Sequence, residues 1–147
     1  MTEPADGTWV LVVEDDDDLR MAIVDMLADF NVQAKAAEEG CDALLMLMEG
    51  ARPGLILLDL HMPFMNGWEF RRCMQLDPAF AKIPIAIITG ADVGRSVDSL
   101  QAVEILRKPL GLYAIGRLHD LILRNCMQRP PKPHALRHSV ALGEATV

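Results

Sequence analysis

The chain has 147 residues, a length that suits one domain with a sizeable core. Its net charge is −7, and residues 1–124 hold 11 basic against 20 acidic residues, which argues against direct binding to nucleic acid because phosphate contacts need clustered Lys and Arg. No uncharged apolar run is long enough to span a membrane and the acidic N-terminus does not resemble a signal peptide, so we expect a cytoplasmic protein that does not bind membranes.

The three cysteines indicate neither a disulfide framework nor a zinc site. Cys41, Cys73 and Cys126 are far apart, odd in number and form no Cys-x-x-Cys pair. We expect reduced and mostly buried thiols.

The first apolar run, Trp9 to Val13, predicts a buried strand that ends in the acidic stretch Glu14 to Asp18. Asp16, Asp17 or Asp18 can cap the helix that follows, where acidic groups also complement the helix dipole. The inner face of this helix is predicted to consist of Leu19, Ile23, Met26, Leu27 and Phe30, with Asn31 as the stop.

The second strand and helix have a weaker pattern. Val32, Ala34 and Ala36 alternate with polar residues, as in a strand near the edge of a sheet. The next helix is predicted from Gly40 to Met48, with Leu44, Leu47 and Met48 facing inward.

The stretch Leu55 to Gly67 is the most informative part of the chain. Four consecutive apolar residues end at a single carboxylate, Asp59, as in a strand buried on both faces of a parallel sheet. The Met62-Pro63 and Asn66-Gly67 pairs then predict turns. A helix from Trp68 to Met74 follows, running on through Leu76 until Pro78 disturbs it.

The last third of the chain contains two more predicted strands. Ile83 to Ile88 is an apolar strand that ends at Thr89-Gly90, with Pro84 tolerated only near its start. A short helix with Val93, Val97 and Leu100 is predicted next. Glu104 to Leu106 forms the last strand and is followed by Arg107-Lys108-Pro109.

The final helix is predicted to begin at Leu112 and to bury Ile115, Leu118, Ile122 and Cys126. The prolines after Arg129 cannot continue a helix, because proline lacks the amide hydrogen. We therefore expect one domain over residues 8–126 and a flexible, proline-containing tail over 127–147.

Five strand and helix pairs in strict alternation predict an α/β fold with a parallel sheet and helices on both faces. The carboxyl ends of parallel strands lie at one edge, so Glu14, Asp15, Asp59, Thr89 and Lys108 should converge there. Two charges about 4 Å apart repel by about 4 kcal/mol at an effective dielectric near 20, so three carboxylates need a cation or protons. All-oxygen ligands favour Mg²⁺.

A carboxylate beside Mg²⁺ can attack a phosphoryl group and form an acyl phosphate. The charge on the peripheral oxygens of that group must then be stabilised. Mg²⁺, the Lys108 ammonium and the Thr89 hydroxyl can each take one of these oxygens.

These motifs resemble the receiver domains of two-component response regulators. The resemblance rests on Val-Val-Glu14-Asp15, on Asp59 with Met62-Pro63 and Asn66-Gly67, on Thr89-Gly90 and on Lys108-Pro109, and it covers about residues 8–126. It implies a flavodoxin-like doubly wound (βα)5 fold with strand order 2-1-3-4-5. It also implies a stand-alone phosphoacceptor module that receives its phosphoryl group from a sensor histidine kinase or a histidine phosphotransfer protein.

The resemblance also assigns roles to individual residues. Asp59 would be the phosphoacceptor, and Asp15 and Asp59 would bind Mg²⁺ directly, with Glu14 acting through water and His61 through its backbone carbonyl. Thr89 and Lys108 would bind the phosphoryl group. The Lys108-Pro109 bond would be cis.

Two departures from the family pattern concern the output of the signal. Many members have Tyr or Phe three residues before the lysine, where this chain has Ile105, so the usual aromatic relay is absent. The segment between Thr89 and Lys108 is also short, so the helix within it should be curtailed or shifted.

We expect a signalling protein and not a turnover enzyme, acting as a monomer or weak homodimer through contact with an unknown downstream protein. One alternative is a receiver-like docking module that works without phosphorylation. Another is an aspartyl phosphohydrolase, which would need an acid where this chain has His61. The His61 side chain could instead influence attack of water on the acyl phosphate, whereas His119 is expected to be solvated and Trp9 and Trp68 to serve packing.

Overall fold

A computed structural model describes residues 4–90 and 94–127, in which strands and helices alternate along the chain. The strands are β1 (Trp9–Val13), β2 (Gln33–Ala37), β3 (Leu55–Asp59), β4 (Ile85–Thr89) and β5 (Glu104–Arg107). They form one parallel sheet in the order β2-β1-β3-β4-β5. The predicted flavodoxin-like (βα)5 fold and its strand order are confirmed.

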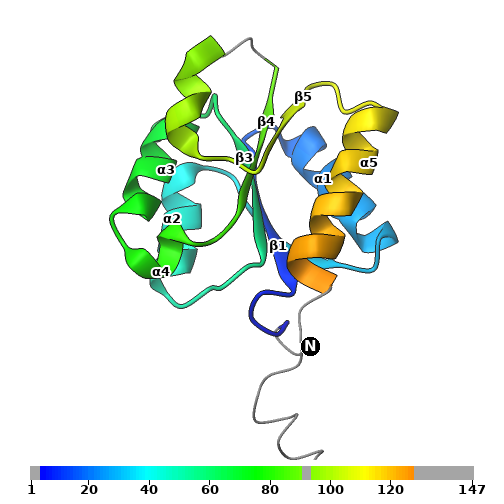
Figure 1. The fold of residues 1–147 in the computed structure, drawn as a ribbon, viewed down its shortest axis with the longest axis horizontal. Helices are drawn as coiled ribbons and strands as arrows, with labels where there is room; N and C mark the ends of the chain where they lie inside the picture. The colour runs from blue at the N-terminus through cyan, green and yellow to red at the C-terminus, as the bar shows by residue number, and fades with distance from the viewer. Residues whose placement is uncertain (1–3, 91–93, 128–147) are drawn as a thin grey trace, which may run out of the picture.

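The helices form two layers, one on each face of the sheet (Figure 1). One face is covered by α1 (Asp17–Asp29) and α5 (Leu112–Ile122), which continues as a π-helical turn, Leu123–Met127. The other face is covered by α2 (Gly40–Met48), α3 (Gly67–Gln75), α4 (Pro78–Ala81) and the 3-10 helix η1 (Gly94–Leu100).

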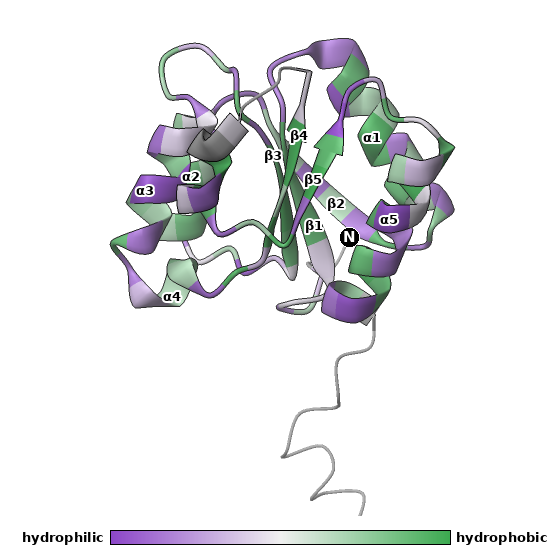
Figure 2. Cartoon of the chain, turned by 45° about the horizontal axis from the view of Figure 1, so that its top comes forward, coloured by the Kyte–Doolittle hydropathy of each residue, from purple (hydrophilic) through white to green (hydrophobic). Residues whose placement is uncertain are grey.

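The three central strands are buried on both faces. In β1, Leu11 and Val13 pack against the layer of α2 and α3, whereas Val10 and Val12 pack against α1 and α5. Because both faces need apolar side chains, these strands have continuous apolar runs (Figure 2). Within the described ranges, no helix is long and apolar enough to cross a membrane.

Several expectations about individual helical residues were wrong. Met48 is 67% exposed. Ala43 and Leu47, one turn apart, make the central buried contacts of α2, and Met48 is rotated about 100° away from Leu47 around the helix axis. His119 is half-buried, since its ring packs against Phe30 at a centroid distance of 4.8 Å. The predicted end of the preceding helix is confirmed, since α3 ends at its C-cap Leu76 and Pro78 begins the separate helix α4, which Asp77 caps.

The thiols also differ from expectation. All three cysteines are free, as predicted, but only Cys126 is buried, whereas Cys41 is exposed and Cys73 lies between. The predicted helix residue Val93 and most of the predicted tail lie outside the described residues.

Candidate functional site

The carboxyl ends of four strands bring the predicted site residues to one edge of the sheet. Asp59 and Thr89 are the last residues of β3 and β4, Glu14 follows β1 and Lys108 follows β5. In the register of the sheet Thr89 lies beside Arg107, and its carbonyl accepts a hydrogen bond from the Lys108 amide at 2.9 Å. Glu14 and Lys108, 94 positions apart in sequence, are thus neighbours.

The carboxylates form a compact cluster. One oxygen each from Glu14, Asp15 and Asp59 lies within 4.8 Å of the others. Glu14 and Asp59 are only 2% and 3% exposed, whereas Asp15 is exposed to solvent. The cluster is therefore buried on one side and open on the other, as a site for an exchangeable ligand must be.

Lys108 supplies the positive charge of the cluster. Its ammonium lies 3.0 Å from Glu14 Oε2 and 3.4 Å from Asp59 Oδ1, and it donates a hydrogen bond of 3.2 Å to Glu14 Oε1. One ammonium thus faces two buried carboxylates and remains 25% exposed. The cluster keeps an excess of negative charge.

The electrostatic consequence is a set of shifted pKa values. Burial raises the pKa of Glu14 to about 7, with the Asp59 charge adding to the rise and Lys108 opposing it. Burial also raises the pKa of Asp59, against the opposing effects of Lys108 and of the His61 amide. For Lys108, burial lowers the pKa, but the hydrogen bond to Glu14 and the two carboxylate charges outweigh burial and raise it.

This arrangement predicts a specific pH dependence for Glu14→Gln. Because the folded protein binds a proton at Glu14 that the unfolded chain releases, the parent should lose roughly 2–3 kcal/mol of unfolding free energy between about pH 5 and pH 7 from this group. The variant should lack that loss and be the more stable protein at about pH 8. Urea unfolding of both proteins in EDTA measures the difference, and a difference independent of pH would contradict the assignment.

The donor set fits a small hard cation. The three clustered ligand atoms are carboxylate oxygens, and the Lys108 ammonium contacts both oxygens of Glu14, at 3.2 Å for Oε1 and 3.0 Å for Oε2. Three carboxylates beside the Lys108 ammonium still carry an excess of negative charge, which is costly next to buried groups unless a further cation or a proton joins them. The excess of negative charge, the all-oxygen donor set and the open side together match the ligand preference of Mg²⁺.

The loop after β3 is shaped to hold Asp59 in place. The His61 amide donates to Asp59 Oδ1 at 3.3 Å, and the Gly67 amide donates to the Leu60 carbonyl at 2.9 Å. Asn66 caps α3 and forms a capping box with Glu69. These bonds fix the chain on both sides of the carboxylate.

The His61 imidazole is exposed and meets the Trp68 ring edge-on at a centroid distance of 5.6 Å. Trp68 also packs against the core, and Trp9 is 3% exposed, so the predicted packing roles of both tryptophans are confirmed. The roles predicted for the His61 carbonyl and imidazole remain predictions.

Arg20 was missed at the level of sequence. Its guanidinium donates to the Glu14 carbonyl at 3.0 Å and pairs with Asp17 and Glu38. It thereby ties α1 to the end of β1 and to the segment after β2. The sequence signal that could have identified this role is an arginine one turn after the acidic start of a helix.

The two predicted departures have a structural counterpart. Ile105 is 40% exposed on the edge strand β5, on the face opposite to that of Leu106. The described part of the connection between β4 and β5 contains the seven-residue 3-10 helix η1 and no α-helix. The Lys108-Pro109 bond is cis, as predicted.

The chain resembles known proteins over most of its length. The family model for the response regulator receiver domain matches residues 10–120. Protein Rrf1 of Nitratidesulfovibrio vulgaris is 32% identical over 119 residues, which is 73% of this chain and 86% of that protein. Several longer curated relatives match over only 30–57% of their own length.

Solved structures agree with the fold. A response regulator receiver protein from Pseudomonas putida is 31% identical with a TM-score of 0.71, and the match covers 82% of this chain and 99% of that one. The receiver domain of a sensor histidine kinase from Pseudomonas aeruginosa, described with a magnesium ion in its active-site cleft, has a TM-score of 0.70. That match is 22% identical and covers 82% of this chain and 98% of the other.

Proposed function

This chain belongs to the response regulator receiver domain family, and we propose that Asp59 accepts a phosphoryl group from a histidine kinase or histidine phosphotransfer protein. The observation that carries the proposal is the cluster in which Lys108 bridges buried Glu14 and Asp59. A lone strand-end aspartate could be a helix cap. A buried aspartate that is paired with a lysine and lies beside two other carboxylates supports a role in phosphoryl chemistry.

Asp59, Lys108 and Thr89 have different roles in the proposed transfer. An Asp59 carboxylate oxygen forms the new bond to phosphorus while the bond from phosphorus to the donor imidazole breaks, and the imidazole leaves. Lys108, 3.4 Å from Asp59 Oδ1, stays beside the transferred group and offsets its charge. The buried Thr89 at the end of β4 offers a hydroxyl to a second phosphoryl oxygen.

Glu14, Asp15 and Asp59, with the His61 backbone carbonyl, are the residues we assign to Mg²⁺. The ion would neutralise charge on the phosphoryl oxygens. The magnesium ion described for the Pseudomonas aeruginosa receiver domain supports this assignment.

In this proposal the protein is a cytoplasmic signalling module and not a turnover enzyme. Phosphorylation adds about −1.5 to −2 charge at the carboxylate edge and shifts an existing equilibrium between two conformations. A downstream protein then binds the conformation that phosphorylation favours.

The test is phosphorylation by a small phosphodonor such as acetyl phosphate in the presence of Mg²⁺. Intact-mass measurement should show one added phosphoryl group in the parent and none in Asp59→Asn, because the amide is not a nucleophile of this kind. Omission of Mg²⁺ should also suppress the adduct. An adduct that persists in Asp59→Asn, or none in the parent, would refute the assignment.

A second candidate function is favoured by Ile105, which lies exposed at the position where the receiver pattern implied by the resemblance has Tyr or Phe. The chain would then be a docking module whose partner does not distinguish the phosphorylated form. Binding of a captured partner that is unchanged by Asp59→Asn and by beryllofluoride would support this reading.

A further inference from the structure

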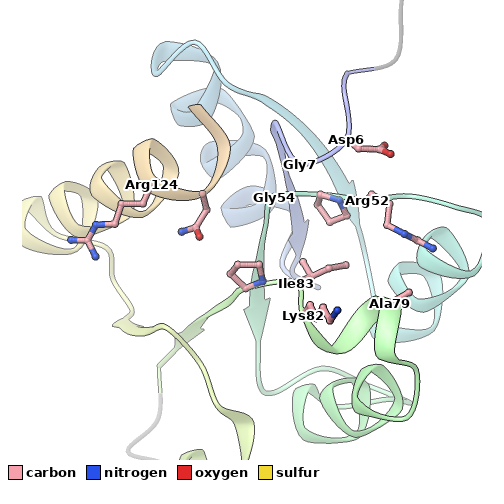
Figure 3. A pocket seen from close by; sticks show the side chains of 11 residues that line it. Asp6, Gly7, Arg52, Gly54, Ala79, Lys82, Ile83 and Arg124 are labelled. Atoms are coloured by element: carbon pink, nitrogen blue, oxygen red, sulfur yellow. The ribbon is translucent and has the colours of Figure 1, made fainter. Parts of the chain in front are cut away.

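A pocket of about 570 Å³ lies at the edge of the sheet opposite to the carboxylate cluster (Figure 3). It is lined by the chain that leads into three strands, at Gly7 before β1, Gly54 before β3 and Pro84 before β4. A five-residue strand spans about 16 Å, so this pocket and Asp59 lie at opposite ends of β3. It is a separate site from the one proposed for phosphorylation.

The charge of the pocket is opposite to that of the protein. Arg52, Lys82 and Arg124 line it against a single carboxylate, Asp6, whereas the whole chain has a net charge of −7. Within residues 4–90 and 94–127, none of these three cations forms an ion pair. Unpaired cations gathered in a hollow of an acidic protein favour an anionic ligand.

Arg52 is held in a fixed position. Its Nη1 donates to the carbonyls of Leu47 at 3.0 Å and Ala51 at 2.7 Å, and its guanidinium lies over the Phe80 ring at 5.2 Å. Figure 3 shows Arg52 and Lys82 on one side of the pocket and Arg124 across from them, extending away from the centre. Arg52 and Lys82 are therefore the principal cations, and Arg124 belongs to the rim.

The remaining walls are rigid and largely apolar. Pro53, Ile83 and Pro84 line the pocket, Pro84 being partly exposed and the other two largely buried. At Gly54 a Cβ atom would lie 2.3 Å from the Gly7 carbonyl oxygen and 2.6 Å from that of Asn125, so the backbone there is closely packed. The volume exceeds what an inorganic phosphate needs and falls within the usual range of small-molecule sites.

We propose that this pocket binds a small organic phosphate of the size of a nucleoside monophosphate. Arg52 and Lys82 bind the phosphate, with Arg52 offering the planar donor geometry that suits phosphate oxygens. The organic body lies on Pro53, Ile83 and Pro84. The proposal does not depend on phosphorylation at Asp59.

Calorimetric titration of the full chain with adenosine monophosphate, in EDTA and at low salt, tests the site. We expect saturable binding that weakens as salt is added, since exposed charges are screened. Adenosine and inorganic phosphate, each lacking half of the ligand, should both bind at least about threefold more weakly. No saturable binding of the nucleotide, or equal binding of inorganic phosphate, would overturn the proposal.

Lys82→Glu tests the residue assignment without endangering the fold, because Lys82 is exposed. Charge reversal should weaken nucleotide binding by about tenfold or more, while the Arg124→Glu change at the rim should cost about threefold. The matched control is Arg72→Glu on the exposed side of α3, which should bind as the parent does. An equal loss of affinity in Arg72→Glu would show that the nucleotide is attracted non-specifically. An unchanged affinity in Lys82→Glu would refute the site. Lys82→Glu and Arg72→Glu should both still accept a phosphoryl group at Asp59.

Discussion

Replacing Lys108 with methionine is expected to destabilise the metal-free protein by about 3 kcal/mol at about pH 8, because two buried carboxylates lose the cation that contacts both of them. Glu14 and Asp59 are almost fully buried, so water cannot compensate for the missing charge. Methionine keeps most of the volume of the lysine stem, so the loss measures charge and not packing. Urea unfolding in EDTA gives the value.

The same variant should show a pH dependence of a definite sign. Removal of Lys108 takes away an effect that lowers the pKa of Glu14, which lies at about 7 in the parent. Both carboxyls of the variant can then become neutral by binding protons, so the destabilisation should shrink as the pH falls from about 8 to about 5. Mg²⁺ should restore part of the stability at high pH, since a divalent cation supplies the missing charge.

Lys82→Met is the matched control, since Lys82 is exposed and makes no ion pair among the described residues. Its unfolding free energy should stay within about 0.5 kcal/mol of the parent. If the proposed transfer takes place at Asp59, the rate of phosphorylation should fall by about 100-fold in Lys108→Met and remain unchanged in Lys82→Met. Equal stability of the two variants would mean that Lys108 does not neutralise the cluster.

The strand ends could be predicted from sequence because two signals coincide there. Buried parallel strands leave continuous apolar runs, and each run here stops at a residue that is costly to bury, such as Asp59 or Thr89. Strict alternation of strands and helices then allows only one edge on which those residues can meet. Helix and strand boundaries were accordingly correct to within one or two residues for β1, α2, β3 and β5.

The features that sequence reasoning missed depend on what lies across the packing interface. An acidic stretch predicts a solvated helix start, and only the fold shows that Glu14 is buried whereas Asp15 to Asp18 are exposed. Met48 follows the helical period of α2 but is exposed, because Ala43 and Leu47 make the buried contacts of this helix. The pocket at the other edge is likewise invisible in sequence, because Arg52 and Lys82 come from unrelated segments.

Gly67→Ala should be the most damaging small substitution near the site. A Cβ atom there would lie 2.8 Å from the Asp59 carbonyl oxygen, 2.8 Å from Leu60 Cα and 2.8 Å from Leu60 Cδ2. Two of these three atoms are backbone, so the start of α3 and the end of β3 must move apart. The hydrogen bond from the Gly67 amide to the Leu60 carbonyl would lengthen as a result.

We expect Gly67→Ala to cost about 3 kcal/mol of unfolding free energy, at the upper end for overpacking. Phosphorylation should fall by about 100-fold, because Asp59 is covalently joined to the displaced backbone and a shift near 1 Å is enough for such a loss. Gly116→Ala is the matched control, since Gly116 is a solvent-exposed residue in the middle of α5 with nothing within 4 Å of the new Cβ. That change should stabilise the protein by about 0.5–1 kcal/mol and leave phosphorylation intact. If both alanine variants behaved alike, the close approach of Gly67 to Asp59 would have no role in placing the carboxylate.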